Sequence, residues 1–457
     1  MADPFLADTL NIATFKTIGF FAAYALVARS LRWGRGAALL AAFVFTNANG
    51  LMVQAGHVQL QSVALLPVAM LLATAIGQAE RQDRRRAACV AAVALALLMA
   101  GWLLTAYYMA WFTIFFTAVF VLCWMITAGQ WRPRSLLRLA IRYNSIVEIG
   151  GIAFFLALIP FLIVYLPKIQ ETGGQGYQAA LPYLVQPLDV INVGPSNYLW
   201  GWRLRLRPEA FAGGEHITGY GPLLFGLAMV ALWWSLARPT TVGDRQFSGV
   251  LRAFALAIVL CWLLTLQVGT FSAWAFVFDW VPGAKGLRVV TRFQLFLLLP
   301  VLWIVVAAFR HRASEWAQRR PLLLASTVLL LIAEQFGSDV PVQISRSIDG
   351  AALRAVPPPP SACHSFYVVA ARRDEPVYVD AARTAVYPHN VDAMLLAELW
   401  RVPTINGLST FNPRDWDFAE PHGASYYARV AFYIAHHRLK SVCRLDVRQA
   451  RPWRFVS

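Results

Sequence analysis

Charged side chains are scarce in this sequence. Asp, Glu, Lys and Arg together make up 14% of the 457 residues, whereas the hydrophobic types make up 58%. Soluble domains usually contain about 25% charged residues. This shortage excludes an ordinary multidomain soluble protein and favours a chain that uses lipid as its solvent.

Familiar catalytic motifs are also absent. The sequence has no Walker phosphate loop, no dinucleotide glycine fingerprint after a strand, no nucleophile elbow and no paired-histidine zinc motif. Its beginning, MADPFLADTLN, lacks the basic, apolar and small-residue succession of a signal peptide. The missing motifs exclude little for a membrane enzyme.

Long apolar runs dominate the first three quarters of the chain. A membrane-spanning helix needs about 20 apolar residues, and most runs approach that length, although the second and the last are shorter. We therefore predict an α-helical polytopic membrane protein with about ten transmembrane helices. The ten runs are residues 10–28, 36–50, 58–77, 87–104, 107–127, 147–166, 220–237, 250–269, 290–309 and 321–334.

Arginine is concentrated in every second connection between these runs. Because cytoplasmic loops collect Lys and Arg, the alternation predicts an inner-membrane protein whose termini and long 168–219 loop lie outside the cytoplasm. Much of the net charge of +16 is then arginine beside anionic lipid, and it does not indicate nucleic-acid binding. The basic connections are residues 29–35, 81–86, 132–142, 238–252 and 310–320.

The last quarter of the chain is less apolar. We expect a transmembrane bundle at 1–336, a Pro-rich linker at 337–360 and a small extracytoplasmic α/β domain at 361–457. The hydrophobic periodicity predicts the elements of this domain. They are strands at 365–371 and 376–380 and helices at 391–400 and 426–437.

Only five cysteines occur, and three of them fall in apolar runs. Cys363 and Cys443 lie in the outer tail, where an oxidising compartment allows a disulfide between them. Two free thiols are the alternative. The sequence leaves this choice open.

Metal ligands are sparse in the tail. His436 and His437 are adjacent, so on a helix they face different sides, and no ligand spacing repeats near them; we predict no metal site there. Asp415 and Asp417 form an acid-x-acid pair that could hold a divalent ion, with a solvated turn as the alternative. No cofactor beyond such a divalent cation is expected.

Two groups of cations lie in outer connections. Arg203, Arg205 and Arg207 alternate, so on an extended segment they would point the same way and could clasp a phosphate. Interfacial anchoring by Trp and Arg is the alternative. The second group precedes the ninth run and consists of Lys285, Arg288 and Arg292.

The second group is a candidate phosphate site. If the helix of the ninth run has already begun there, Arg288 and Arg292 share one face near its amino end, where the helix dipole also attracts anions. Contact with lipid headgroups is the alternative.

Three polar residues recur at helical spacing near the third run. Gln54, His57 and Gln61 would be costly facing lipid, so we expect them to face the bundle interior or water. His57 is a candidate substrate-binding residue. A capping or interhelical hydrogen-bond role is favoured for it over catalysis.

A family resemblance rests on five segments. Together they resemble bacterial membrane glycosyltransferases of the C superfamily, particularly those with an external carboxy-terminal domain. The segments are GHVQLQSVALLPVAML (56–71), LTAYYMAW with its tyrosine pair (104–111), GEHITGYGPL (214–223), PGAKGLRVVTRF (282–293) and PTINGLSTFNP (403–413).

The resemblance implies transfer of a sugar from a polyprenyl-phosphate donor to an acceptor outside the membrane. Such a reaction needs a base for the acceptor hydroxyl and cations for the departing phosphate. Glu215 is the candidate acid or base, His216 and Tyr220 could line its cleft, and Lys285, Arg288 and Arg292 could bind the phosphate. The alternative for Glu215 is that it only orients those cations.

The sequence departs from the family in one place. The catalytic acid of the superfamily usually lies in the first long external loop, whereas the connection 51–57 here contains no acid. We therefore expect that an amino-terminal hairpin precedes this sequence and that activity depends on it.

Two other classes of function remain alternatives. A transporter of lipid or sugar would show repeated halves and mid-membrane charges, which the sequence does not clearly contain. A non-catalytic membrane assembly protein with a glycosyltransferase-like fold is the other. The expected partners are the bilayer and a polyprenyl-phosphate-linked sugar.

Overall fold

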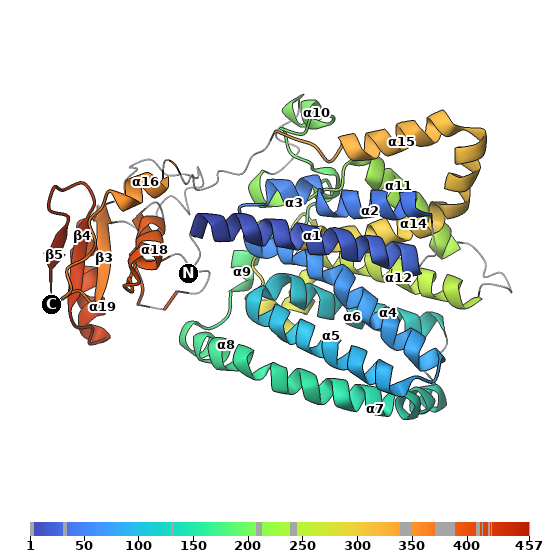
Figure 1. Cartoon of the computed structure of the whole chain (residues 1–457), viewed down its shortest axis with the longest axis horizontal. Helices are drawn as coiled ribbons and strands as arrows, with labels where there is room; N and C mark the ends of the chain where they lie inside the picture. The colour runs from blue at the N-terminus through green and yellow to red at the C-terminus, as the bar shows by residue number, and fades with distance from the viewer. Residues whose placement is uncertain are drawn as a thin grey trace. The chain divides into compact units, whose positions relative to one another are not determined.

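The structure is a computed structural model in which the chain divides into two compact units. The first unit comprises 1–166 and 175–343, and the second comprises 167–174 and 344–457. Figure 1 shows that the first is helical and that the second contains a small sheet. The described residues are 4–30, 34–128, 132–206, 213–237, 245–338, 347, 349–370, 389–407, 412–413, 415–418, 421 and 423–456.

The described residues up to 338 form long helices, several short helical turns and one small hairpin. Its elements in chain order are α1 (Pro4–Ser30), α2 (Arg35–Thr46), α3 (Asn49–Val53), η1 (Val58–Leu65), α4 (Leu66–Arg81), α5 (Arg85–Thr105), α6 (Tyr107–Thr127), α7 (Pro133–Ala157), α8 (Ile159–Thr172), α9 (Tyr177–Ala180), η2 (Leu181–Tyr183), η3 (Asp189–Ile191), α10 (Gly201–Leu206), η5 (Gly214–His216), α11 (Pro222–Ala237), α12 (Arg245–Thr265), β1 (Gln267–Val268), β2 (Phe271–Ser272), α13 (Trp274–Trp280), η6 (Ala284–Gly286), η7 (Val290–Arg292), α14 (Phe293–Arg319) and α15 (Pro321–Ala333).

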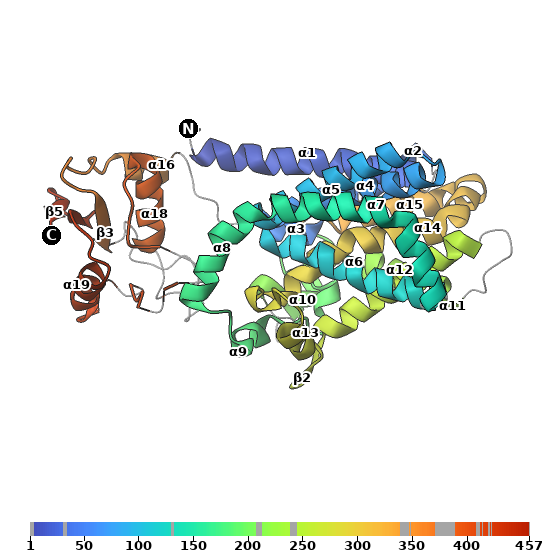
Figure 2. The same ribbon diagram turned by 90° about the horizontal axis from the view of Figure 1, so that it is seen from below.

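All ten predicted runs are helical, but fewer have the length of a membrane span. Within the described residues, six helices are long and apolar enough to cross a membrane. A seventh is present if α7 and α8, which meet at a bend of 52°, form one span (Figure 2). The other three apolar helices in this part of the chain are shorter: Pro222–Ala237, Gly249–Thr265 and Pro321–Ala333. The structure therefore supports six or seven membrane-spanning helices in the described residues, fewer than the ten that we expect from the sequence.

Helix α14 forms the centre of the bundle. Its first half, from Phe293 to Val305, is buried on all sides, as expected for a helix that is apolar around its whole circumference. Helices α2, α6, α11, α12 and α15 contact it, while α1, α4, α5 and α7 follow one another in the rest of the bundle (Figure 1). The residues before α14 are therefore fixed by the best-packed element of the protein.

The second unit is a small α/β fold, as predicted. Strand β3 carries apolar side chains on both faces, which is typical of a strand covered on both sides. Phe366 and Val368 pack into one core with α18, and Tyr367 and Val369 pack into another with α19. The sheet order is β3-β4-β5, with β3 parallel to β4 and β4 antiparallel to β5. The elements are α16 (Asp349–Arg354), β3 (Ser365–Ala370), α18 (His389–Trp400), α19 (Tyr426–His436), β4 (Val442–Asp446) and β5 (Trp453–Phe455).

Two details refine the expected organisation of the tail. A disulfide joins Cys363 to Cys443 with their Cα atoms 5.6 Å apart, which links the residues before β3 to β4. The expected linker 337–360 is not all spacer, because Leu353 and Val356 pack into the core of the second unit. The expected strand 376–380 lies outside the described residues.

Candidate functional site

Three side chains from distant segments meet beside the start of α14. Arg292 donates two hydrogen bonds to the Glu215 carboxylate, from Nη2 at 2.8 Å and from Nε at 3.1 Å. His57 Nε2 lies 3.1 Å from Glu215 Oε1. Glu215 and Arg292 are buried, whereas the His57 side chain is 38% exposed. We call Glu215, His57 and Arg292 the Glu215 cluster.

The surroundings of Glu215 keep its carboxyl group ionised. Burial opposes ionisation, but the hydrogen bond from His57 and the charge and hydrogen bonds of Arg292 outweigh it and lower the pKa of Glu215 to about 2. A carboxylate with so low a pKa is a weak base. In this geometry Glu215 is better suited to orient His57 than to accept a proton itself.

The neighbouring His216 turns away from the cluster and forms a buried pair with Asp189. Its Nδ1–H donates to Asp189 Oδ2 at 2.7 Å, and its Nε2–H donates to the Pro182 carbonyl at 2.8 Å. Burial would lower the pKa of His216, but the hydrogen bond to Asp189 and the charge of Asp189 raise it. Both ring nitrogens are hydrogen-bonded, so His216 links its own segment to the segment that contains Pro182 and Asp189.

Long-range hydrogen bonds hold the segment that carries Glu215. Gln54 Nε2 donates to the Gly214 carbonyl, and Asn192 Nδ2 donates to the His216 carbonyl. Farther along, the buried Glu334 carboxylate accepts hydrogen bonds from the amides of Leu223 and Leu224 at the start of α11. Hydrogen bonds therefore hold this segment at both ends, and they keep the backbone of Glu215 in place.

Aromatic residues at the start of α6 hold the loop before α14. Tyr107 donates to the Gly283 carbonyl at 2.8 Å, and the Tyr108 hydroxyl accepts the Arg288 amide at 2.9 Å. Gly283 has a φ of 84°, and a Cβ there would overlap the Tyr107 hydroxyl, so only glycine fits. The guanidinium of Arg292 lies 5.3 Å from the Tyr108 ring centroid.

The three cations before α14 have different surroundings. Arg292 is committed to Glu215, Lys285 is exposed, and Arg288 is half-buried over the Tyr183 ring at 5.4 Å. The Nε of Arg288 is buried and has no hydrogen-bond partner among the described residues. The prediction that Arg288 and Arg292 share a helix face is wrong, because α14 begins at Phe293 and Leu287 and Val289 are extended.

Other predicted site residues lie elsewhere. Arg203 and Arg205 are exposed on the helix α10, so they do not alternate along an extended segment as expected; Arg207 lies outside the described residues. Tyr220 is buried and donates to Gln294 Oε1 at 3.0 Å, so it packs inside the bundle and does not line an open cleft.

An apolar cavity of about 420 Å³ lies between the helices of the bundle and opens at its surface, where the lining residues Ala73 and Ile114 are exposed. Helices α1, α4, α5, α6, α12 and α14 contribute to its wall. Its volume lies within the range of small-molecule sites, roughly 300–1,000 Å³. Representative lining residues are Ala73, Phe116, Thr117, Phe296, Pro300 and Trp303.

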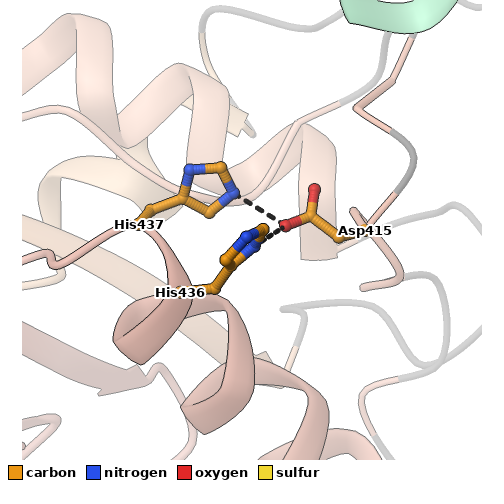
Figure 3. A group of neighbouring side chains, drawn as sticks. All are labelled: Asp415, His436 and His437. Atoms are coloured by element: carbon orange, nitrogen blue, oxygen red, sulfur yellow. Dashed lines mark hydrogen bonds and ion pairs between the residues drawn. The ribbon is translucent and has the colours of Figure 1, made fainter.

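A second cluster of titratable side chains lies in the second unit (Figure 3). Asp415 Oδ2 accepts hydrogen bonds from His436 Nδ1 at 2.7 Å and from His437 Nε2 at 2.8 Å. Asp417 instead pairs with Arg429 at 2.7 Å. The predicted acid-x-acid pair is therefore separated, and the two adjacent histidines, predicted to diverge, converge on one carboxylate.

Several partners in these clusters carry no recognisable signal in the sequence. Sequence patterns do not identify Asp189, Tyr183 or the carbonyl of Pro182, because their contacts join positions far apart in the chain. The tyrosine pair at Tyr107 and Tyr108 did stand out in the sequence, although only as part of a family resemblance. Its role in holding the loop before α14 became visible only in the fold.

Comparison with known proteins assigns neither a family nor a function to this chain. No protein-family model matches this sequence, and no curated protein matches it either. The resemblance to membrane glycosyltransferases rests on the five segments quoted above, and a functional assignment depends on the geometry of the Glu215 cluster and its surroundings.

Proposed function

We propose that this protein binds a polyprenyl-phosphate-linked sugar beside the Glu215 cluster and transfers the sugar to a hydroxyl acceptor on the outer side of a bacterial inner membrane. The observation that carries the proposal is an apolar cavity that follows the Glu215 cluster along α6 and α14, with Lys285 and Arg288 in the loop that leads into α14. Arg292, Phe296 and Pro300 follow one another at intervals of four residues and share a face of the chain at α14. Phe296 and Pro300 line the cavity.

Helix α6 also runs from the Glu215 cluster to the cavity. Tyr108 contacts Arg292, and Phe116, two turns farther along the helix, lines the cavity. Phe112 lies between them and packs on Phe293 with ring centroids 4.7 Å apart. A polyprenyl-phosphate donor has the matching order of groups, because its anionic head is followed directly by an apolar chain. The cations would bind the head, and the cavity would take the first part of the tail.

Arg288 and Lys285 are the residues that we assign to the phosphate. Neither forms an ion pair with an acid among the described residues, and a guanidinium fork matches phosphate oxygens. Arg292 already donates from Nε and Nη2 to Glu215, so we assign it to the positioning of that carboxylate. Arg292 positions Glu215, and through Glu215 it positions His57.

His57 is the proposed general base. The Nε2–H of the neutral imidazole donates to Glu215, which leaves the lone pair on Nδ1, and the ring is exposed enough to meet a substrate. The acceptor oxygen attacks the anomeric carbon, the bond from that carbon to the phosphate oxygen breaks, and the electron pair stays on the phosphate. The acceptor proton goes to His57 Nδ1.

A non-catalytic binding protein is the second candidate. The observation that favours it is the double hydrogen bond between Arg292 and Glu215, which removes the basicity of the most prominent carboxylate in the site. Such a protein would bind the lipid-linked sugar through the same cations and cavity and leave it unchanged.

The experiment separates binding from transfer with the purified full-length protein in lipid nanodiscs. We expect Arg288→Ala to weaken binding of polyprenyl phosphate by roughly tenfold or more, since a charged contact is worth about 1.5–3 kcal/mol. His57→Gln should leave binding unchanged and lower sugar transfer by about 10²-fold or more. Transfer is measured with a panel of polyprenyl-phosphate-linked sugars and a hydroxyl acceptor.

Each variant has a matched control elsewhere in the bundle. Arg312 also lies over an aromatic ring, that of Trp234 at 4.6 Å, and Arg312→Ala should leave binding unchanged. Ala73→Trp should obstruct the cavity and weaken binding, whereas Ala75→Trp on the same helix, outside the cavity lining, should not. Binding without transfer by the wild type would support the non-catalytic candidate. Equal binding by Arg288→Ala, Ala73→Trp and the wild type would contradict both.

A further inference from the structure

The Asp415, His436 and His437 side chains bring three metal-ligating groups into one small space. One ligand atom from each residue lies within 4.8 Å of the other two. Figure 3 shows both imidazoles pointing at the same carboxylate. We propose that these three residues bind a divalent transition-metal ion of borderline softness, with Zn²⁺ as the best match. This proposal concerns the second unit and does not depend on the proposed sugar transfer.

The end of α19 explains how two adjacent histidines converge. His436 is the last residue of the helix, and His437 follows it as the C-cap. His436 reaches Asp415 with Nδ1, the nitrogen nearer its backbone, whereas His437 reaches it with the more distant Nε2. The different reach of the two nitrogens compensates for the different directions of the side chains.

The backbone of this helix end is fixed before any ion binds. Arg438 adopts a left-handed φ of 50°, and the amides of Arg438 and Leu439 donate to the carbonyls of Ala435 and Ile434. These hydrogen bonds terminate the helix in the manner of a left-handed C-cap. A ligand pair at such a terminus has little freedom to move apart.

The imidazole rings are also held by neighbours. His437 packs on Tyr433 with ring centroids 4.2 Å apart, and His436 stacks on Phe432 at 5.7 Å. On the other side, the amide of Trp416 donates to the Pro413 carbonyl and forms the turn that presents Asp415. Rings and a carboxylate that are fixed in this way meet the main requirement of a metal site.

The donor set selects the class of ion. Imidazole nitrogens suit Zn²⁺ and other late first-row ions, whereas Mg²⁺ and Ca²⁺ prefer oxygen ligands. Two histidines and one carboxylate leave one tetrahedral position open for water or another ligand. With metal–ligand bonds of about 2.0–2.1 Å, the oxygen-to-nitrogen distances would widen from 2.7 and 2.8 Å by roughly half an ångström.

Charge and access agree with this assignment. Arg429 pairs with Asp417, and Asp415 forms no ion pair with a Lys or Arg among the described residues. The three side chains are 22%, 59% and 35% exposed in chain order, so a hydrated ion can reach them. A bound ion would link the 415–418 segment to the end of α19.

The test uses the full-length protein in detergent, with its purification tag removed and its metal stripped by chelation. Zn²⁺ is titrated against a chromophoric chelator, and Co²⁺ absorption reports the coordination geometry. We expect one saturable Zn²⁺ site per chain, with an affinity at least tenfold lower in Asp415→Asn, His436→Gln and His437→Gln. A tenfold excess of Mg²⁺ should not displace Zn²⁺.

Two variants in the same unit serve as controls. Asp417→Asn removes a neighbouring carboxylate, and His364→Gln removes an exposed histidine; both should bind Zn²⁺ as the wild type does. Circular dichroism and an intact Cys363–Cys443 disulfide check that each variant is folded. Absence of a saturable site in the wild type, or equal affinity in the wild type and the three ligand variants, would overturn the proposal. Displacement of Zn²⁺ by Mg²⁺ would overturn the choice of ion.

Discussion

The two units of this protein each place histidine beside a carboxylate, but in opposite environments. In the first unit Glu215 is buried and an arginine already neutralises it. In the second unit Asp415 meets two imidazoles near the surface. Burial with a fixed counter-charge leaves His57 as the one exposed member of the Glu215 cluster, whereas the Asp415 group is partly exposed and has no Lys or Arg partner among the described residues. We therefore propose proton transfer for the first arrangement and metal binding for the second.

The largest expected effect comes from removing the counter-charge in the buried cluster. Arg292→Leu should lower the free energy of unfolding of the protein by about 3–5 kcal/mol, because it leaves Glu215 buried and unpaired. Thermal unfolding in detergent measures the loss. The double variant with Glu215→Leu should recover part of it.

The Arg429–Asp417 pair of the second unit, whose carboxylate is exposed, provides the control for this prediction. Arg429→Leu removes the partner of Asp417, whose side chain is 64% exposed, and should cost only about 0–1 kcal/mol. Equal losses for the Arg292 and Arg429 variants would show that burial does not distinguish the two regions.

Acid should act on the two regions unequally. The pKa of Glu215 is lowered from 4.5 to about 2, so its contribution is present above about pH 4.5 and is lost as the pH falls toward 2. The loss should be roughly 3 kcal/mol for this depression of the pKa. Thermal unfolding between pH 5 and pH 2 should therefore show a steeper decline in the wild type than in Glu215→Gln. Parallel declines would contradict the assigned pKa.

A smaller effect is expected at the aromatic support of the loop before α14. Tyr108→Phe removes a hydroxyl that accepts the amides of Arg288 and Val289 at 2.9 and 3.3 Å, and should cost about 1–2 kcal/mol. It should also weaken polyprenyl phosphate binding, because Arg288 loses its backbone support. Tyr107→Phe, which removes a donor to the exposed Gly283 carbonyl, is the matched control and should have the smaller effect on binding.

Local pattern predicts the long apolar helices and three of the six elements that the structure describes in the second unit. It misses α16, β4 and β5. Hydropathy found all ten apolar helices, and periodicity found β3, α18 and α19 within a few residues. These patterns do not predict how many of the helices are long enough to span a membrane. The helix ends, and bends such as the one between α7 and α8, depend on packing.

The clusters themselves were only partly predictable. The sequence predicts a candidate role for each of Glu215, His57 and Arg292. It assigns Arg292 to a phosphate and gives the orientation of the cations by Glu215 only as the alternative, whereas the structure pairs Arg292 with Glu215. The error has a physical source: spacing along a chain shows which residues share a helix face, and it says nothing about a partner 77 positions away.

Composition and hydrophobic periodicity are enough to establish an apolar, helical chain with a small mixed tail, because both are properties of short segments. Tertiary structure decided which charges cancel and which remain available. Arg288 and Arg292 are only four positions apart, yet Arg292 pairs with Glu215 and Arg288 lies over the Tyr183 ring. Their different surroundings come from where α14 begins and from the loops packed against it, and only the folded chain brings those elements together.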